Sequence, residues 1–127
     1  MIIGIGTDIV SYQRICEIEK KYGERLAKRM LSESELQEYA TSNDKPRYLM
    51  KHFAAKEAFA KAMGTGLRAS VTLRRISIDH NDLGKPLLAF DEVLSNYVAR
   101  LGVTRHHLSI SDEKDVAVAF VVLEGEN

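Results

Sequence analysis

The segment that most constrains the fold is 45–63, because it carries helix signals at both ends and an alanine-rich stretch between them. Asp44 precedes the segment and can cap its first turn, where Pro46 is also well tolerated. Gly64 follows the segment and ends the helix. Small alanine side chains let another element pack closely against such a helix. A chain of 127 residues favours one domain, so we expect a single domain, 1–127, that contains this long helix.

Shorter elements surround this helix in the predicted fold. Residues 2–10 are rich in β-branched residues and glycine, which predicts a short buried strand carrying one charge, Asp8. Ser32 and Glu35 form a capping-box pattern that begins a helix ending near Thr41. We expect further helices at 11–22 and 91–101, a helical or turn segment at 23–31, and strands at 74–80, 86–90, 106–111 and 116–123. This order predicts an α+β fold in which a largely antiparallel sheet packs with the long helix and the shorter ones.

Charge and cysteine content exclude several classes of protein. The chain has 18 basic and 18 acidic residues, which argues against a surface devoted as a whole to nucleic acid or to a membrane. The lone Cys16 excludes an internal disulfide framework and is too few for a cysteine-based zinc site. It favours a reducing compartment, most simply the cytoplasm. No stretch approaches the roughly 20 apolar residues of a membrane span.

Two carboxylates and a lysine are candidates for chemistry. Asp8 lies in an apolar strand, where an acid is costly to bury unless it is paired or bound to a cation. In the long helix, His52, Lys56, Glu57 and Lys61 fall on one half of the helical wheel, and the last two form an i,i+4 pair. One interpretation is a strand-end acid and an ordinary surface ion pair. The other is a Mg²⁺ site for a phosphate ligand, because magnesium typically uses one or two carboxylates.

Glycine turns and one strand face supply further candidates. The turn 64–66 follows the long helix, and the segment 84–86 follows a strand. Both are compatible with plain turn chemistry, and both could let backbone amides and a lysine approach a phosphate. Neither has the glycine spacing of a P-loop or of a dinucleotide-binding motif. Strand alternation places three polar side chains on one face of 106–111: His107, Ser109 and Ser111.

Basic residues are concentrated in two segments. Residues 14–29 contain six basic and three acidic side chains, and residues 45–61 contain five basic side chains and one acidic one. These segments are compatible with solvated faces. They are also compatible with one surface for an acidic protein and another for a phosphorylated small molecule.

Four motifs together resemble one enzyme family over essentially the whole chain. They are GIGTDIV at 4–10, FAAKEAFAKAMGTG at 53–66, LGKP at 83–86 and HLSISD at 107–112. In this order they resemble the holo-[acyl-carrier-protein] synthases, the small bacterial 4'-phosphopantetheinyl transferases. The resemblance implies transfer of the phosphopantetheine arm of coenzyme A to a serine of acyl carrier protein, in support of fatty acid biosynthesis. It also implies release of adenosine 3',5'-bisphosphate, a requirement for Mg²⁺, and a homotrimer with each coenzyme site between two subunits.

The resemblance also implies roles for individual residues. Asp8 and Glu57 match the metal-binding acids, Lys61 the helix lysine and His107 the strand histidine. Our hypothesis is that Glu57, or a water on the metal, accepts the proton of the carrier serine. Lys61 then stabilises or protonates the departing phosphate, and His107 orients substrate. The coenzyme contacts implied are Lys56, Gly64, Thr65, Gly66, Lys85, Pro86, Ser109 and Ser111, and the carrier-protein contacts are Arg14, Arg25 and Arg29.

Two other functions remain open at this point. A different Mg²⁺-dependent phosphotransferase or nuclease could use Asp8 and Glu57, but it would not need the basic segment 14–29. A carrier-protein-binding module without catalysis would not need Asp8, Glu57 and Lys61 together.

Overall fold

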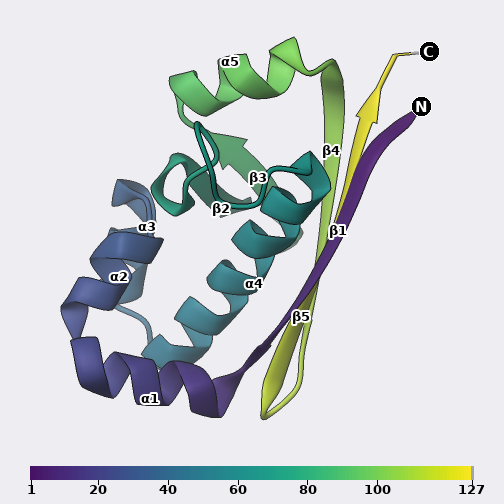
Figure 1. The fold of residues 1–127 in the computed structure, drawn as a ribbon. Coiled ribbons are helices and arrows are strands. Elements are labelled where there is room, and N and C mark those ends of the chain that lie inside the picture. The colour runs from purple at the N-terminus through teal and green to yellow at the C-terminus, as the bar shows by residue number, and fades with distance from the viewer. Residues whose placement is uncertain (127) are drawn as a thin grey trace.

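The computed structural model describes residues 1–126 and shows an α+β fold (Figure 1). The elements in chain order are β1 (Ile2–Ser11), α1 (Tyr12–Tyr22), α2 (Glu24–Met30), α3 (Glu33–Ala40), α4 (Lys45–Met63), the 3₁₀-helix η1 (Leu73–Arg75), β2 (Ile76–His80), β3 (Pro86–Phe90), α5 (Glu92–Arg100), β4 (Val103–Asp112) and β5 (Val116–Gly125). Every helix and strand predicted from the sequence is present. The last two strands are longer than predicted, because pairing between them continues past the apolar residues that marked them.

The strands form two antiparallel sheets. Three strands pair in the order β1-β5-β4, and β2 pairs with β3 in a separate hairpin. Helix α4 packs against the inner face of the three-stranded sheet, with α1, α2 and α3 toward one end of the molecule and α5 toward the other (Figure 1). Among residues 1–126, no helix combines the length and the apolar character that crossing a membrane requires.

Helix α4 is the centre of the core. Asp44 caps it by accepting a hydrogen bond from the backbone N–H of Arg47 at 3.1 Å, and Gly64 ends it in the left-handed conformation, with φ 78°. His52 and Lys56 share one half of the helical wheel with Glu57 and Lys61, yet both of their side chains are buried. The helix has elements packed on several sides, so its polar stripe faces other parts of the protein rather than water.

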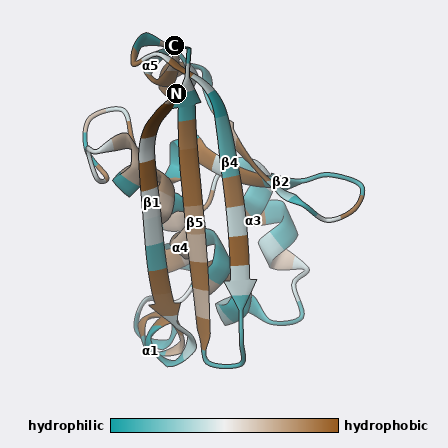
Figure 2. Ribbon diagram, turned by 90° about the vertical axis from the view of Figure 1, so that its right-hand side faces the viewer, coloured by the Kyte–Doolittle hydropathy of each residue, from teal (hydrophilic) through white to brown (hydrophobic). Residues whose placement is uncertain are grey.

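Strand β1 differs from the predicted buried strand, because only one of its faces is inside. Gly6 and Val10 face inward, whereas Ile5 and Ile9 are 59% and 68% exposed on the outer face of the sheet. Figure 2 looks onto this outer face and shows hydrophobic residues along β1 and β5. The isoleucines at 5 and 9 therefore mark an uncovered face, while Gly6 and Val10 mark the packed one.

The glycines of β1 permit an unusually close approach to α4. A methyl group at Gly4 would overlap the carbonyl oxygen of Ala62, and one at Gly6 would overlap that of Ala58. Strand and helix backbones are therefore in direct contact here. Asp8, two residues further along β1, is carried next to α4 by this contact.

The hairpin of β2 and β3 projects beyond the β4 edge of the sheet (Figure 2). Its turn is closed by the Asn81 side chain, whose Oδ1 accepts from the backbone N–H groups of Leu83 and Lys85 at 3.0 and 2.9 Å. Leu83 at the tip is 96% exposed.

Candidate active site

The close contact between β1 and α4 brings three predicted site residues together. The Lys61 ammonium donates a hydrogen bond to Asp8 Oδ1 at 3.0 Å and another to the carbonyl oxygen of Thr7 at 3.0 Å. Glu57 lies one helical turn before Lys61 and interacts electrostatically with both Asp8 and Lys61. The ion pair in the structure thus joins the helix lysine to the strand acid, rather than to Glu57 as the sequence spacing allowed.

Asp8 and Glu57 line a groove of about 520 Å³ between β1, α1, α2 and α4. Apolar side chains form much of its wall, and Arg14 supplies a positive charge on the α1 side. The other residues that line it are Ile9, Val10, Ser11, Ile15, Ile18, Met30, Phe53 and Val116. The groove therefore combines two acids, one arginine and an apolar wall.

The charge balance of this groove suits a cation. Burial raises the pKa of Glu57 above its ordinary value, and the Asp8 carboxylate raises it further, while Lys61 opposes them. Two carboxylates that repel one another favour a bound cation, and hard oxygen donors are the ligands that Mg²⁺ prefers. No cluster of three or more histidine, cysteine or acidic side chains with metal-binding geometry occurs among residues 1–126. Asp8 and Glu57 are thus a two-carboxylate set, which fits Mg²⁺ because that ion keeps several waters.

The predicted residues of β4 lie on the opposite edge of the sheet. His107, Ser109 and Ser111 are exposed on its outer face, as the strand alternation predicts. His107 Nε2 lies 3.2 Å from Glu124 Oε2 on β5, a contact that orients the imidazole and lowers the pKa of Glu124. Strand β5 separates β4 from β1, so within one chain these residues stand apart from Asp8.

The remaining predicted coenzyme contacts fall at two places. The turn of Gly64, Thr65 and Gly66 directly follows the end of α4, near the contact between Ala62 and β1. Lys85 and Pro86 lie at the β2–β3 hairpin, beyond β4 (Figure 2). None of these five residues lines the groove of Asp8 and Glu57.

The structure corrects the prediction that Lys56 contacts the coenzyme. Its side chain is 0% exposed, and its ammonium donates to Met30 O at 2.7 Å, to Leu73 O at 3.0 Å and to the Glu35 carboxylate at 2.6 Å. A lysine ammonium has three N–H donors, and protein acceptors use all of them. Lys56 therefore has no free N–H donor for the coenzyme.

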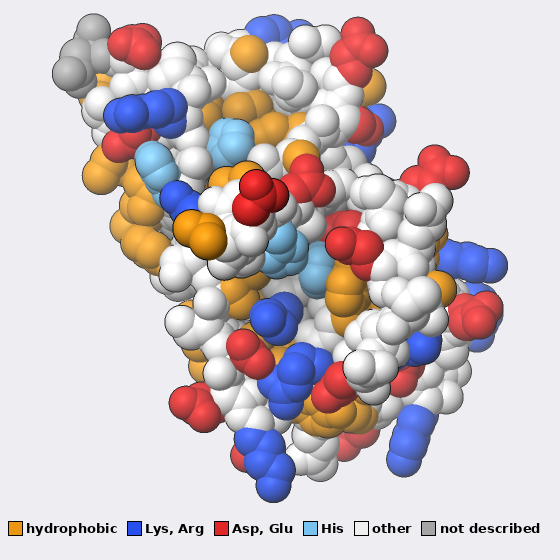
Figure 3. Space-filling model, turned by 180° about the vertical axis from the view of Figure 1, so that it is seen from behind, with side chains coloured by type: hydrophobic (Ala, Val, Ile, Leu, Met, Phe, Trp, Pro, Cys, Tyr) orange, Lys and Arg blue, Asp and Glu red, His pale blue; other side chains and the backbone are white. Residues whose placement is uncertain are grey.

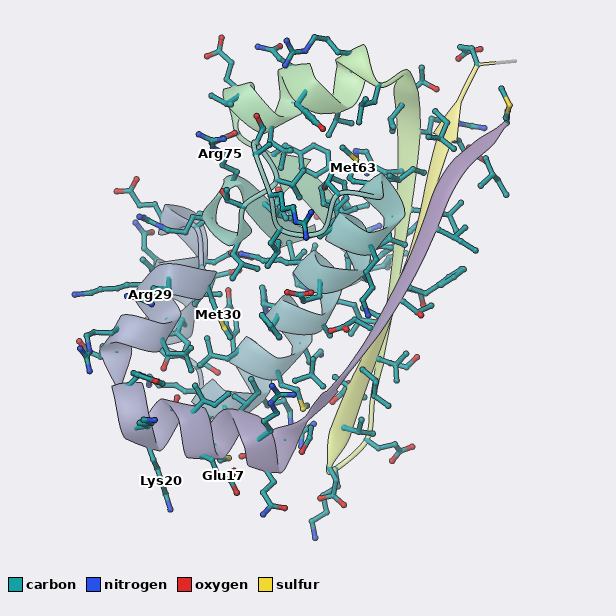
Figure 4. The ribbon with its side chains drawn as sticks, in the orientation of Figure 1. Glu17, Lys20, Arg29, Met30, Met63 and Arg75 are labelled. Carbon is teal, nitrogen blue, oxygen red and sulfur yellow. The ribbon has the colours of Figure 1, made fainter. Side chains whose placement is uncertain are left out.

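The three predicted carrier-protein contacts line two neighbouring hollows. Arg14 lies in the groove of Asp8 and Glu57, while Arg25 and Arg29 line a hollow of about 270 Å³ between α1 and α2. Ile18 lines both hollows, and Tyr22 and Leu26 complete the second. Figure 4 shows Arg29 extending outward from α2. A basic surface with apolar side chains between its arginines thus leads to the candidate metal acids.

Comparison with known proteins decides the family. The model of the 4'-phosphopantetheinyl transferase superfamily matches residues 4–121, which include both motifs that bring Asp8 and Glu57 together. This chain belongs to that superfamily.

Individual relatives of the transferase agree with this assignment. The holo-[acyl-carrier-protein] synthase of Nitrosospira multiformis is 53% identical over 124 residues, which cover 98% of this chain and 99% of the relative. The crystal structure of the synthase from Neisseria meningitidis is 50% identical, covers 98% of this chain and 99% of its own, and superposes with a TM-score of 0.95. The synthase from Bacillus anthracis, crystallised in complex with CoA (3',5'-ADP), is 36% identical over 99% of each chain, with a TM-score of 0.80.

Sequence reasoning missed three features of the transferase site. Met30 and Ile18 line the groove beside Glu57, but an apolar residue on a short helix carries no signal of such a role. Glu124 contacts His107, and strand pairing could have suggested this contact because the two residues lie near one another on adjacent strands. Glu35 was identified only as a helix cap, whereas its carboxylate also binds Lys56.

Proposed function

We propose that this transferase moves the 4'-phosphopantetheine group of coenzyme A to a serine of apo-acyl carrier protein, in support of fatty acid biosynthesis. The other product is adenosine 3',5'-bisphosphate. The observation that carries the proposal is the groove in which Asp8, Glu57 and Arg14 meet beside Lys61. The relatives named above act on the acyl carrier protein, and one of them was crystallised with coenzyme A.

The chain's own residues can perform the transfer. The serine hydroxyl attacks the phosphorus of the pantetheine phosphate, a new O–P bond forms, and the anhydride P–O bond breaks toward the nucleotide. Glu57 is the proposed acceptor of the serine proton. Lys61 is exposed enough to reach the departing phosphate and to stabilise its charge. Asp8 and Glu57 would hold Mg²⁺, which when bound neutralises charge on the pyrophosphate.

The carrier protein is proposed to dock on α1 and α2. Arg14, Arg25 and Arg29 present positive charge, and the hollow containing Tyr22 and Leu26 can take an apolar side chain. An acidic helix with an apolar residue fits both features. Docking there brings the carrier serine to the groove, because Ile18 belongs to the walls of both hollows.

We also propose that the active site is shared between subunits of a homotrimer. Asp8, Glu57 and Lys61 lie at the β1 edge of the sheet, whereas His107 lies on the β4 strand at the other edge. Repeated contact of one subunit's β1 side with the next subunit's β4 side is a heterologous interface, and such interfaces can close a ring. In a ring, the two halves of the site meet once for each subunit.

Exposed apolar side chains on the sheet support this assembly. Figure 3 views the molecule from behind and shows hydrophobic side chains gathered along the side where the sheet lies. The exposed hydrophobic residues on β1 and β5 are Ile2, Ile3, Ile5, Ile9, Val118 and Phe120. Contiguous exposed apolar residues typically mark an interface. A second and a third copy of this chain are the proposed occupants.

Two broader proposals complete the assignment. We propose residues 1–127 as a single phosphopantetheinyl transferase domain, which is supported by the family match over 4–121. We propose a cytoplasmic location, which is supported by the lone Cys16, since a reducing compartment keeps such a thiol free.

Mass spectrometry tests the proposed reaction. The protein is incubated with coenzyme A, Mg²⁺ and apo-acyl carrier protein, and the carrier is examined for the phosphopantetheine adduct. We expect the adduct with the natural chain, no adduct without Mg²⁺, and strongly reduced formation with Glu57→Gln. Arg75→Met, which breaks a surface ion pair outside the groove, is the matched control. Carrier binding without any adduct would contradict the proposal and favour an inert binding module.

A further inference from the structure

Lys56 and Glu35 form an ion pair that is completely enclosed by protein. Lys56 is 0% and Glu35 is 1% exposed, and the ammonium lies 2.6 Å from Glu35 Oε1. Glu35 Oε1 also accepts from the backbone N–H of Ser32 at 2.9 Å, and Glu35 Oε2 accepts from the backbone N–H of Ile78 at 2.9 Å. Nothing in the transfer chemistry described above uses this pair.

The pair joins α4 to four other parts of the chain. Lys56 donates to the last residue of α2, Met30, and to the first residue of η1, Leu73. Glu35 belongs to α3, and its second oxygen holds Ile78 in β2. These elements lack strand pairing with the main sheet, so these polar contacts hold them against α4 together with apolar packing in the core.

Stability alone is a weak explanation for this arrangement. Removing two charges from water is costly, and buried ion pairs are often no better than well-packed apolar residues of similar volume. Burial lowers the pKa of Lys56, the direction expected when desolvation opposes the charge. What a buried pair with several directional hydrogen bonds supplies is a defined geometry.

That geometry bears directly on the groove. Glu57 is the residue after Lys56, and the Met30 side chain lies in the groove wall beside Glu57. Figure 4 shows Met30 at the end of α2 that lies toward α4, while Arg29 extends away from it. Lys56 therefore donates to the carbonyl oxygen of Met30 at 2.7 Å. Glu57, the next residue on α4, faces the groove that the Met30 side chain also lines.

We propose that Lys56 and Glu35 are positioning residues that fix α2, with its carrier-binding arginines, relative to Glu57 on α4. This inference rests on the proposed function, since it assigns the pair to the approach of the carrier serine. The spacing of Asp8 and Glu57 is set separately, by the contact between the glycines of β1 and the alanines of α4. The pair thus affects catalysis with the carrier protein as substrate, and it does not affect binding of the metal ion.

A neutral double variant tests the proposal. Lys56→Met with Glu35→Gln removes both charges together and leaves no unpaired buried ion. Below its unfolding temperature, we expect kcat/KM for the carrier protein to fall about tenfold or more, because a small displacement of reacting groups is costly. The KM for coenzyme A and the half-saturating Mg²⁺ concentration should stay within about twofold of the natural chain. Unchanged carrier kinetics, or a loss confined to Mg²⁺ dependence, would overturn the proposal.

Milder and matched variants keep the test decisive. Ser32→Ala removes a hydroxyl 3.2 Å from Glu35 Oε1 and leaves both charges in place. We expect kcat/KM for the carrier protein to fall about twofold to threefold. If the double variant fails to fold, an unchanged kcat/KM for the carrier protein in Ser32→Ala refutes the proposal. Arg75→Met breaks a partly exposed ion pair with Asp91 at 3.6 Å and should alter none of these constants.

Amide hydrogen exchange separates this inference from the proposed reaction. In the double variant, exchange in Glu24–Met30 should accelerate about tenfold, while exchange in Ile2–Ser11 should match the natural chain. If α2 exchanges at the same rate in the double variant as in the natural chain, the positioning role is contradicted. If the natural chain forms no adduct, the proposed function fails, while the exchange result still decides whether the pair holds α2 in place.

Discussion

Asp8 and Glu57 share a groove because two glycines and two alanines let backbones touch. Gly4 and Gly6 lie against the carbonyl oxygens of Ala62 and Ala58, leaving no space for a side chain. Asp8 follows on the same face of β1, and Glu57 precedes Ala58 on α4. The carboxylates are thus placed by the smallest residues in the chain rather than by long side chains reaching toward one another.

A methyl group at Gly6 should disturb this contact. We expect Gly6→Ala to lower the free energy of unfolding by about 1–3 kcal/mol, because β1 must move away from the Ala58 carbonyl. We also expect a higher Mg²⁺ requirement, since Asp8 moves with the strand. Thermal unfolding and Mg²⁺ titration of activity measure the two effects. Thr7→Ala, at the neighbouring exposed position, is the control, and a Gly6→Ala protein equal to it would refute this account.

Among the elements, α4 shows most clearly where sequence analysis succeeds and where it stops. Local signals predicted its bounds, because capping by Asp44 and termination at Gly64 depend on nearby backbone groups. The helical wheel could not show that Lys56 is buried, because the oxygen atoms that accept from its ammonium belong to α2, α3 and η1, far away in the sequence. The position of Asp8 beside Lys61 could be predicted only through the family motifs.

Helix α4 also contains a titratable group that should make folding sensitive to acid. Burial lowers the pKa of His52 below its ordinary value of 6.5; Lys56 acts in the same direction and Glu35 opposes them. The unfolded chain therefore binds this proton more readily, and the free energy of unfolding should fall as the pH drops through 6.5. The contribution of the neutral His52 imidazole to stability is fully present above that pH and is lost as the pH falls toward the lowered pKa of the folded state.

Denaturant unfolding at several pH values measures this contribution. His52→Gln should flatten the decline of unfolding free energy between about pH 7 and pH 5. His80→Gln, which removes an exposed histidine of β2, is the matched control. Identical slopes for the natural chain and His52→Gln would show that this histidine does not carry the effect.

Helices α1 and α2 should determine recognition of the carrier protein. Arg25→Glu is expected to raise the KM for the carrier about tenfold, because it reverses a charge on the proposed docking surface. The KM for coenzyme A should not change, and the effect should shrink in high salt. Lys20→Glu reverses an exposed charge that points away from the rest of the molecule (Figure 4) and is the control. A similar increase in both variants would indicate general charge attraction instead of a defined docking surface.

For the whole molecule, the distribution of site residues over two sheet edges gives the sharpest test of assembly. Glu57→Gln impairs the β1 side of the site and His107→Ala the β4 side. If sites form between subunits, mixed and reassembled variants should regain up to about one quarter of natural activity, because random pairing joins intact halves in that share of sites. If each site lies within one chain, mixing should restore nothing. Activity of the mixture against the separate variants measures the outcome.

The backbone contact between β1 and α4 also determines which parts of the protein can move during a reaction cycle. A strand that touches a helix without intervening side chains cannot slide on it, because each carbonyl would meet the opposing backbone. Asp8 and Glu57 must then travel as one rigid unit. Lys56 and Glu35 hold α2 to α4, so opening and closing of the groove is left to α1 on its other wall. Product release should therefore follow the motion of α1, while the two acids stay in place.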